Sequence, residues 1–98
     1  MRSKALRGIL LDFLKQIYPK EIELIGLYGV FYERHTVDAI NKALGYLVDK
    51  GYVEEKIVPN PYRRYKCYKL YKLTPKGLDL LEGTINDPGI FVPIEEEE

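Results

Sequence analysis

The sequence predicts a mainly helical α+β domain, and three local patterns lead to that expectation. Residues 46–55 have the pattern of an amphipathic helix that stops at Gly51 and continues into a strand. Residues 71–83 predict a strand that runs into a short helix, because Thr74 is a good N-cap and Pro75 suits the first helical position. A basic, aromatic turn, PNPYRRYK, lies between them. Helix, strand, basic loop, strand and helix is the order of a winged helix-turn-helix.

The length of the chain allows one domain. Its 98 residues are 46% apolar, which suits a folded chain with a single modest core. We expect residues 1–83 to form the winged-helix domain. Residues 84–98 are expected to form an extended C-terminal tail that ends in an acidic run.

The first third of the chain predicts two helices with a short strand between them. The first helix ends before Pro19 and buries one apolar stripe, which is Leu6, Ile9, Leu10, Phe13, Leu14 and Ile17. Residues 20–24 alternate and predict the strand. Residues 24–32 are apolar almost all round and predict a second short helix, although a buried strand would show the same run.

A third helix is expected to begin after Thr36, which is a good N-cap. Its inward sector is predicted to hold Val37, Ile40, Leu44, Leu47 and Val48. The opposite sector holds Asp38, Lys42, Tyr46 and Asp49, with Asn41 and Gly45 at its flanks. This outward sector is the surface that a partner would meet.

The rest of the domain predicts a hairpin and a last helix. Residues 52–58 and 65–73 are the expected strands, joined by a turn at residues 59–61. Alternation slips in the second strand, which indicates either a bulge or an exposed wing tip. The helix at residues 75–82 should point Leu78 and Leu81 inward.

The charge is unevenly distributed although fifteen basic residues cancel fifteen acidic ones. Residues 1–20 carry +4 and residues 61–72 carry +5, whereas residues 21–60 carry −3 and residues 73–98 carry −6. Two positive blocks and an acidic tail are therefore hidden in the total.

Several functional classes find no support in the sequence. The single cysteine, Cys67, excludes an intramolecular disulfide and a cysteine-rich zinc site. No stretch approaches the roughly 20 apolar residues of a membrane span. No catalytic triad, glycine-rich phosphate loop or metal-ligand motif is present. We therefore expect a cytoplasmic protein that is not an enzyme and needs no metal or cofactor.

With these elements placed, residues 36–83 resemble winged-helix transcription regulators of the MarR, PadR and ArsR type. The residues that carry the likeness are Ala43, Leu44, Leu47, Gly51, Tyr52, Val53, Leu73, Thr74, Lys76 and Gly77. Nearly the whole chain is also similar to small winged-helix proteins of Mu-like prophages, through its ending LTPKGLDLLEGTINDPGIFVP. The resemblance implies a DNA-binding regulator.

In a helix-turn-helix the second helix of the motif enters the major groove of DNA. The candidates for contact there are Thr36, Asp38, Asn41 and Lys42. Asn pairs well with adenine, Lys with guanine, Asp with the cytosine amino group, and Thr with phosphate or a thymine methyl. The alternative is an ordinary solvated helix face. The acidic residues Asp38 and Asp49 favour this alternative over contact with DNA.

The hairpin tip supplies a second set of candidates, namely Tyr62, Arg63, Arg64 and Lys66. Arginines on a projecting hairpin suit phosphate contact or insertion into a narrow minor groove. The alternative is a solubilising hairpin, because charged strand tips also block edge pairing.

The sequence therefore predicts a sequence-specific, double-stranded DNA-binding protein, a transcriptional regulator that acts as a homodimer. The alternative is a winged-helix module for protein–protein interaction that does not bind DNA. The tail adds four apolar residues, Ile90, Phe91, Val92 and Ile94. They are expected to pack either on their own domain or on a partner subunit, and the remaining alternative is a disordered tail.

Overall fold

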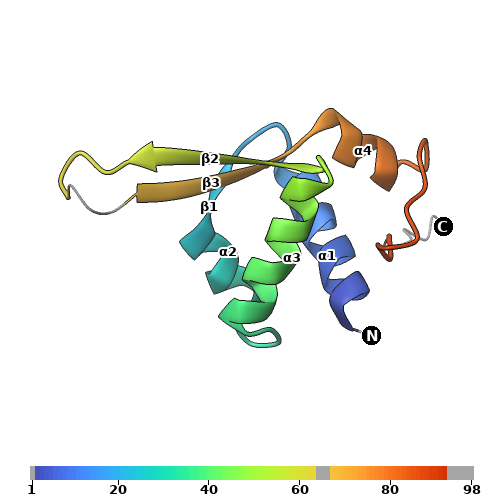
Figure 1. Ribbon diagram of the computed structural model, residues 1–98, viewed down its shortest axis with the longest axis horizontal. Coiled ribbons are helices and arrows are strands. Elements are labelled where there is room, and N and C mark those ends of the chain that lie inside the picture. The colour runs from blue at the N-terminus through green and yellow to red at the C-terminus, as the bar shows by residue number, and fades with distance from the viewer. Residues whose placement is uncertain (1, 64–66, 93–98) are drawn as a thin grey trace.

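The computed structural model describes residues 2–63 and 67–92, and it shows a helical body with a two-stranded ribbon projecting from it (Figure 1). The elements follow the order α1 (Arg2–Ile17), β1 (Ile22–Glu23), α2 (Leu24–Phe31), α3 (Val37–Asp49), β2 (Val53–Pro59), β3 (Cys67–Leu73) and α4 (Pro75–Leu81). This mainly helical α+β arrangement confirms the predicted winged-helix fold class. No helix in the described part of the chain is both long and apolar enough to cross a membrane.

One apolar core lies between the helical body and the sheet. Its buried residues come from every helix, from β2 and β3 and from the segment after α4: Leu6, Leu10, Leu11, Leu14, Leu27, Ile40, Ala43, Leu44, Leu47, Tyr52, Val53, Tyr71, Leu73, Leu80 and Ile90. Because α3 contributes four of these residues, its backbone is fixed against α1 and the sheet. The polar side of α3 is thereby turned to solvent.

Helix α3 ends in a Schellman motif at Gly51. The N–H of Gly51 donates to the carbonyl of Val48, and the N–H of Tyr52 donates to the carbonyl of Leu47. Gly51 has a φ of +83°, which glycine adopts without steric cost. The predicted helix stop is therefore correct, and it sends the chain directly into β2.

The sheet is antiparallel with the strand order β1-β3-β2. Strands β2 and β3 pair without interruption from Val53 opposite Leu73 to Pro59 opposite Cys67. Within residues 67–73, the bulge offered as one explanation of the slipped alternation is therefore wrong. The other explanation holds, because the pair leaves the body and its outer residues are exposed on both faces.

Residues 84–92 fold back on their own domain, beside α1 and α4 (Figure 1). Ile90 is buried in the core, and the N–H of Phe91 donates to the carbonyl of Lys4 on α1. Of the two expected placements of the apolar tail, these residues take the one on their own domain. Ile94 and the acidic run Glu95–Glu98 lie outside the described residues.

A buried carboxylate fixes this returning segment. Asp87 is buried and accepts a hydrogen bond from the Tyr52 hydroxyl at 2.7 Å, and Lys50 Nζ lies 3.3 Å from it. The backbone N–H of Gly89 also donates to Asp87. The Tyr52 and Gly89 hydrogen bonds, with Lys50, hold the pKa of Asp87 below its ordinary value despite its burial.

Several side-chain orientations differ from the predicted ones. Val37, the first residue of α3, is 52% exposed rather than inward. Tyr46 is half-buried rather than outward, because Arg7 stacks on its ring. On α1, Ile9 is exposed while Leu11 is buried. On α4, Leu78 and Leu81 pack against the core as predicted but are only half-buried, and Leu80 is fully buried.

Candidate nucleic-acid interface

The N-terminal end of α3 carries the first group of predicted contact residues. Thr36 Oγ1 accepts a hydrogen bond from the backbone N–H of Ala39 at 3.1 Å, which confirms Thr36 as the N-cap. Its hydroxyl is thus already engaged within the helix. It retains a proton that could be donated to an outside acceptor such as a phosphate oxygen.

Asp38 and Lys42 lie one turn apart on the outward face of α3 and form an ion pair. The Lys42 Nζ to Asp38 Oδ2 distance is 3.3 Å, and both side chains are 78% exposed. An exposed pair of this kind contributes little stability. Its electrostatic consequence is larger, because Asp38 offsets the positive charge that Lys42 would offer to DNA. Asp49 is exposed farther along the same helix.

Asn41 is the member of this group with a partner on another helix. The hydroxyl of Tyr28 on α2 donates to Asn41 Oδ1, with 2.5 Å between the oxygens. The sequence reasoning missed Tyr28, since it read residues 24–32 only as an apolar run. The phenolic hydroxyl of a tyrosine in an apolar helix was the available signal, because such a group normally finds a hydrogen-bond partner.

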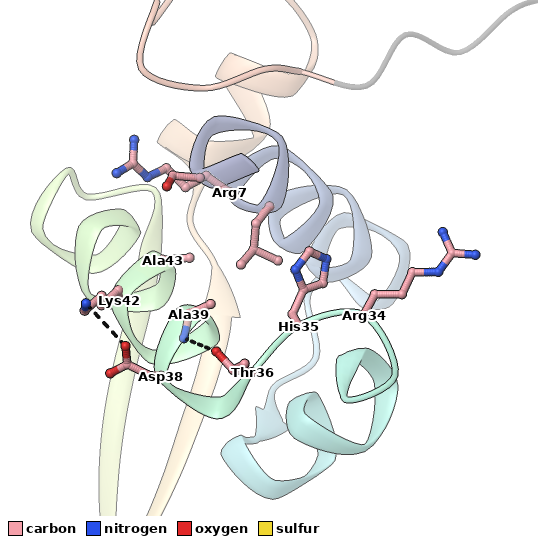
Figure 2. Close-up of a pocket in the computed structure, with 10 residues that line it drawn as sticks. Arg7, Arg34, His35, Thr36, Asp38, Ala39, Lys42 and Ala43 are labelled. Atoms are coloured by element: carbon pink, nitrogen blue, oxygen red, sulfur yellow. Dashed lines mark hydrogen bonds and ion pairs between the residues drawn. The ribbon is translucent and has the colours of Figure 1, made fainter. Parts of the chain in front are cut away.

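A hollow of about 390 Å³ lies beside these residues, between α1, the turn before α3 and α3 itself (Figure 2). Figure 2 shows Arg34 pointing away from α3, whereas Asp38 and Lys42 face each other across one turn. His35 packs edge-on against Phe31, with 6.4 Å between the ring centres. In residues 2–63 and 67–92 no group of three His, Cys, Asp or Glu residues could hold a metal ion. The hollow therefore shows mixed charge and no ligand set.

The second group of candidates lies on the wing, which is formed by β2, β3 and the turn between them. Tyr62 is 91% exposed, and Arg63 is also exposed. Asn60 organises the turn, because its Oδ1 accepts from the N–H of Tyr62 and its carbonyl accepts from the N–H of Arg63. The predicted contacts Arg64 and Lys66 lie outside the described residues.

The two groups of candidates stand apart, since the wing tip extends away from the helical body that contains α3 (Figure 1). The protein measures 48 Å along its longest axis and 27 Å across. The candidates on α3 and those on the wing could therefore meet separate parts of one long, regular partner.

Two basic residues of α1, Lys4 and Arg7, have partners within the domain. The Arg7 guanidinium lies 3.6 Å from the centre of the Tyr46 ring and donates to the carbonyl of Gly89 at 3.1 Å. Lys4 lies over the ring of Phe91. These side chains thus fix the returning segment against α1. Cys67, on the wing, is exposed.

One of three comparisons with known proteins finds a similar fold. No protein-family model and no curated protein matches the chain. Among solved structures, the chain is similar to a crystal structure of a mutant MarR from E. coli complexed with operator DNA. The TM-score is 0.61 and the sequence identity is 28%. The match covers 81% of this chain and 51% of the MarR chain, so the present chain spans about half of that protein. The chain has the winged-helix fold of a transcription regulator of the MarR type.

Proposed function

We propose that this protein is a cytoplasmic, sequence-specific, double-stranded DNA-binding regulator of transcription. The observation that carries the proposal is the 28% identity, over 81% of this chain, to a MarR structure that holds operator DNA. The proposal involves no catalytic step and no cofactor. It rests on the polar face of α3 and the projecting wing as the two elements that meet the duplex.

In this proposal α3 lies in the major groove and the wing follows the adjacent backbone. Asn41 and Lys42 read base edges, Asp38 pairs with a cytosine amino group when Lys42 moves to DNA, and Thr36 contacts a phosphate. Tyr62, Arg63, Arg64 and Lys66 contact phosphates or enter a narrow minor groove. The wing supplies most of the attraction, because α3 carries two acidic residues, Asp38 and Asp49, and only one basic residue, Lys42.

We further propose that the active species is a homodimer. Helix-turn-helix proteins commonly read two half-sites about one helical turn apart, so one recognition helix of this size would bind weakly alone. The returning segment of residues 84–92 lies on its own domain, so the proposed dimer uses another surface.

A second candidate function is a protein-docking module that retains the winged-helix fold. Two observations favour it. The outward face of α3 carries Asp38 and Asp49 against Lys42 alone. On and beside α2, Ile25 is 70% exposed, Tyr32 67% and Val30 49%. Such apolar exposure is typical of a surface that meets another protein.

Selection of duplex DNA on the immobilised full chain separates the two functions. Sheared genomic fragments and random duplexes are passed over the protein, and the retained DNA is sequenced. The DNA-binding proposal predicts enrichment of one motif with two related halves. Retention of no DNA at low salt would support the docking module instead.

A further inference from the structure

The hydrogen bond between Tyr28 and Asn41 joins the two helices of the helix-turn-helix at a position that the proposed function turns toward DNA. Asn41 is exposed on α3, and Tyr28 is half-buried on α2. The Tyr28 hydroxyl donates to Asn41 Oδ1 at 2.5 Å. The contact thus joins a half-buried side chain on one helix to an exposed polar side chain on the other.

The tyrosine itself is held by the core beneath it. Tyr28 packs against the buried cluster and lies close enough to Tyr71 on β3 to affect its titration. Burial is the main cause that raises the pKa of Tyr71, followed by the hydrogen bond that its hydroxyl donates to Glu55 at 2.6 Å. The Tyr71 hydroxyl thus donates to Glu55, whereas the Tyr28 hydroxyl donates to Asn41.

The orientation of the asparagine amide follows from this contact. An amide has one acceptor atom with two lone pairs and one nitrogen with two hydrogens. Tyr28 occupies one lone pair of Oδ1 and fixes that oxygen on the α2 side. The second lone pair and both N–H hydrogens remain for an outside partner. Adenine offers the complement in the major groove, an N7 acceptor beside an N6 donor.

We propose that Tyr28 is a positioning residue that holds the Asn41 amide in the orientation that reads adenine. The inference rests on the proposed function and deepens it, because it names a base and a residue that does not contact DNA. An asparagine held in advance loses less side-chain freedom on binding than one that rotates freely. This advantage in binding applies only where both the oxygen and the nitrogen of the Asn41 amide contact a base. It therefore appears as a preference for one base at one position of the DNA site.

The test compares binding to the selected site with binding to three duplexes in which the base pair read by Asn41 is replaced. The chains are wild type, Tyr28→Phe, Asn41→Ala and the double variant, with Tyr32→Phe as the matched control on the neighbouring exposed tyrosine. Asn41→Ala is expected to lower the preference for adenine at one position by about 5- to 150-fold. Tyr28→Phe is expected to lower it at the same position by about 2- to 10-fold. It should add nothing in the Asn41→Ala background.

A merely structural hydrogen bond gives a different pattern. Tyr28→Phe would then lower affinity for all four duplexes and for random DNA alike, and this result overturns the inference while leaving DNA binding intact. A preference for guanine instead of adenine also overturns it. A wild-type chain that binds no duplex overturns both the inference and the proposed function.

A measurement without DNA completes the test. In wild type the side-chain amide of Asn41 should give NMR signals of one fixed rotamer, and Tyr28→Phe should produce rotamer averaging. Averaged signals in wild type would overturn the inference, whatever the DNA-binding result.

Discussion

At the residue scale, Asp87 is the clearest link between burial, charge and stability. Its pKa is lowered because Tyr52 and Gly89 donate to it and Lys50 lies close by. A lowered pKa in the folded state stabilises the fold above the unfolded value of about 4, and that contribution is lost as the pH falls through the lowered pKa. Asp87→Asn should therefore lower the free energy of unfolding at neutral pH by about 1–3 kcal/mol. The difference from wild type should shrink as the pH falls below 4, as measured by urea denaturation.

The control for this substitution is Asp79→Asn, which changes the same charge at an exposed position on α4. It should leave the unfolding free energy within about 0.5 kcal/mol of wild type. Equal effects of the two substitutions would show that Asp87 acts through net charge and not through its buried contacts.

The hydrogen bond between Tyr52 and Asp87 also affects stability at alkaline pH. Burial first, and the Asp87 carboxylate second, raise the pKa of Tyr52 to about 12. A raised pKa stabilises the fold below the unfolded value of about 10, and the contribution is lost as the pH rises from there through 12. Stability of wild type should thus decline above pH 10. Tyr52→Phe should decline less steeply, and an unchanged slope in thermal melts across this range would contradict the assignment.

Gly77 shows how one residue fixes the approach of α4 to the end of α3. A Cβ at this position would lie 2.4 Å from the carbonyl oxygen of Tyr52 and 2.6 Å from a methyl of Leu73. Backbone cannot move aside cheaply, so Gly77→Ala should cost about 1–3 kcal/mol in urea denaturation. Gly29→Ala is the matched control, because nothing lies within 4 Å of its Cβ position. It should be neutral or stabilise by up to about 1 kcal/mol, and similar losses at both sites would refute the packing argument.

The sequence predicted residues whose role depends on local backbone, and it missed those whose partner is distant along the chain. Thr36 and Thr74 accept from the N–H groups of Ala39 and Gly77, as N-caps do. Tyr28 pairs with a residue 13 positions away, and Tyr52 with Asp87, 35 positions away. No periodicity relates such positions, so only the fold could place them together.

At the scale of single elements, the wing carries the most direct electrostatic prediction. Tyr62 and Arg63 are exposed on the turn, in the segment where residues 61–72 hold five basic and no acidic residues. Replacing Arg63 and Arg64 together by Ala should weaken binding to all duplexes alike. The slope of log K against log salt should flatten by about 2 units, because two phosphate contacts are lost. Fluorescence anisotropy with labelled duplexes at several salt concentrations measures both quantities.

The control for the wing variant removes the same number of positive charges from another part of the chain. Replacing Lys15 and Lys20 by Ala removes two positive charges near the end of α1. This variant should keep the wild-type salt slope. Equal flattening in both variants would show that net charge, and not the wing, determines binding.

The positions of the helices and strands were predictable because capping and turn residues act locally. The exposure of their side chains was less predictable. The stop at Gly51 and the start at Pro75 follow from chain chemistry. The run of residues 24–32 is apolar almost all round, yet in α2 Ile25 and Val30 are exposed and Leu27 alone is buried. An eight-residue helix on the surface of a small body has only one side to bury, and the sequence does not say which neighbours cover it.

At the scale of the whole molecule, the returning segment of residues 84–92 completes the core of a domain with little apolar surface to spare. It supplies Ile90 to the core and a backbone acceptor to Arg7. Deleting residues 84–98 should leave the Ile90 site empty and lower the melting temperature. Removal of only residues 93–98 is the control and should leave melting nearly unchanged, as calorimetry would show. Unchanged melting in the longer deletion would contradict the role assigned to the segment.

The proposed homodimer is also a property of the whole molecule. The sequence offered the tail as an arm for a partner subunit, whereas residues 84–92 lie on their own domain. We therefore expect the chain without residues 93–98 to sediment as wild type does, as a dimer at the concentrations used for DNA binding. A monomer for wild type bound to a palindromic site would contradict the proposed dimer.

The central claim, that the α3 face and the wing bind duplex DNA, is tested most directly by one titration. Wild-type protein is titrated against its selected duplex and a random duplex from about 50 to 200 mM salt. The account predicts that log K falls linearly with log salt for both duplexes. It also predicts that the selected duplex stays the tighter ligand throughout, because base contacts are not screened as phosphate contacts are. Absence of measurable binding to either duplex at the lowest salt would contradict the claim.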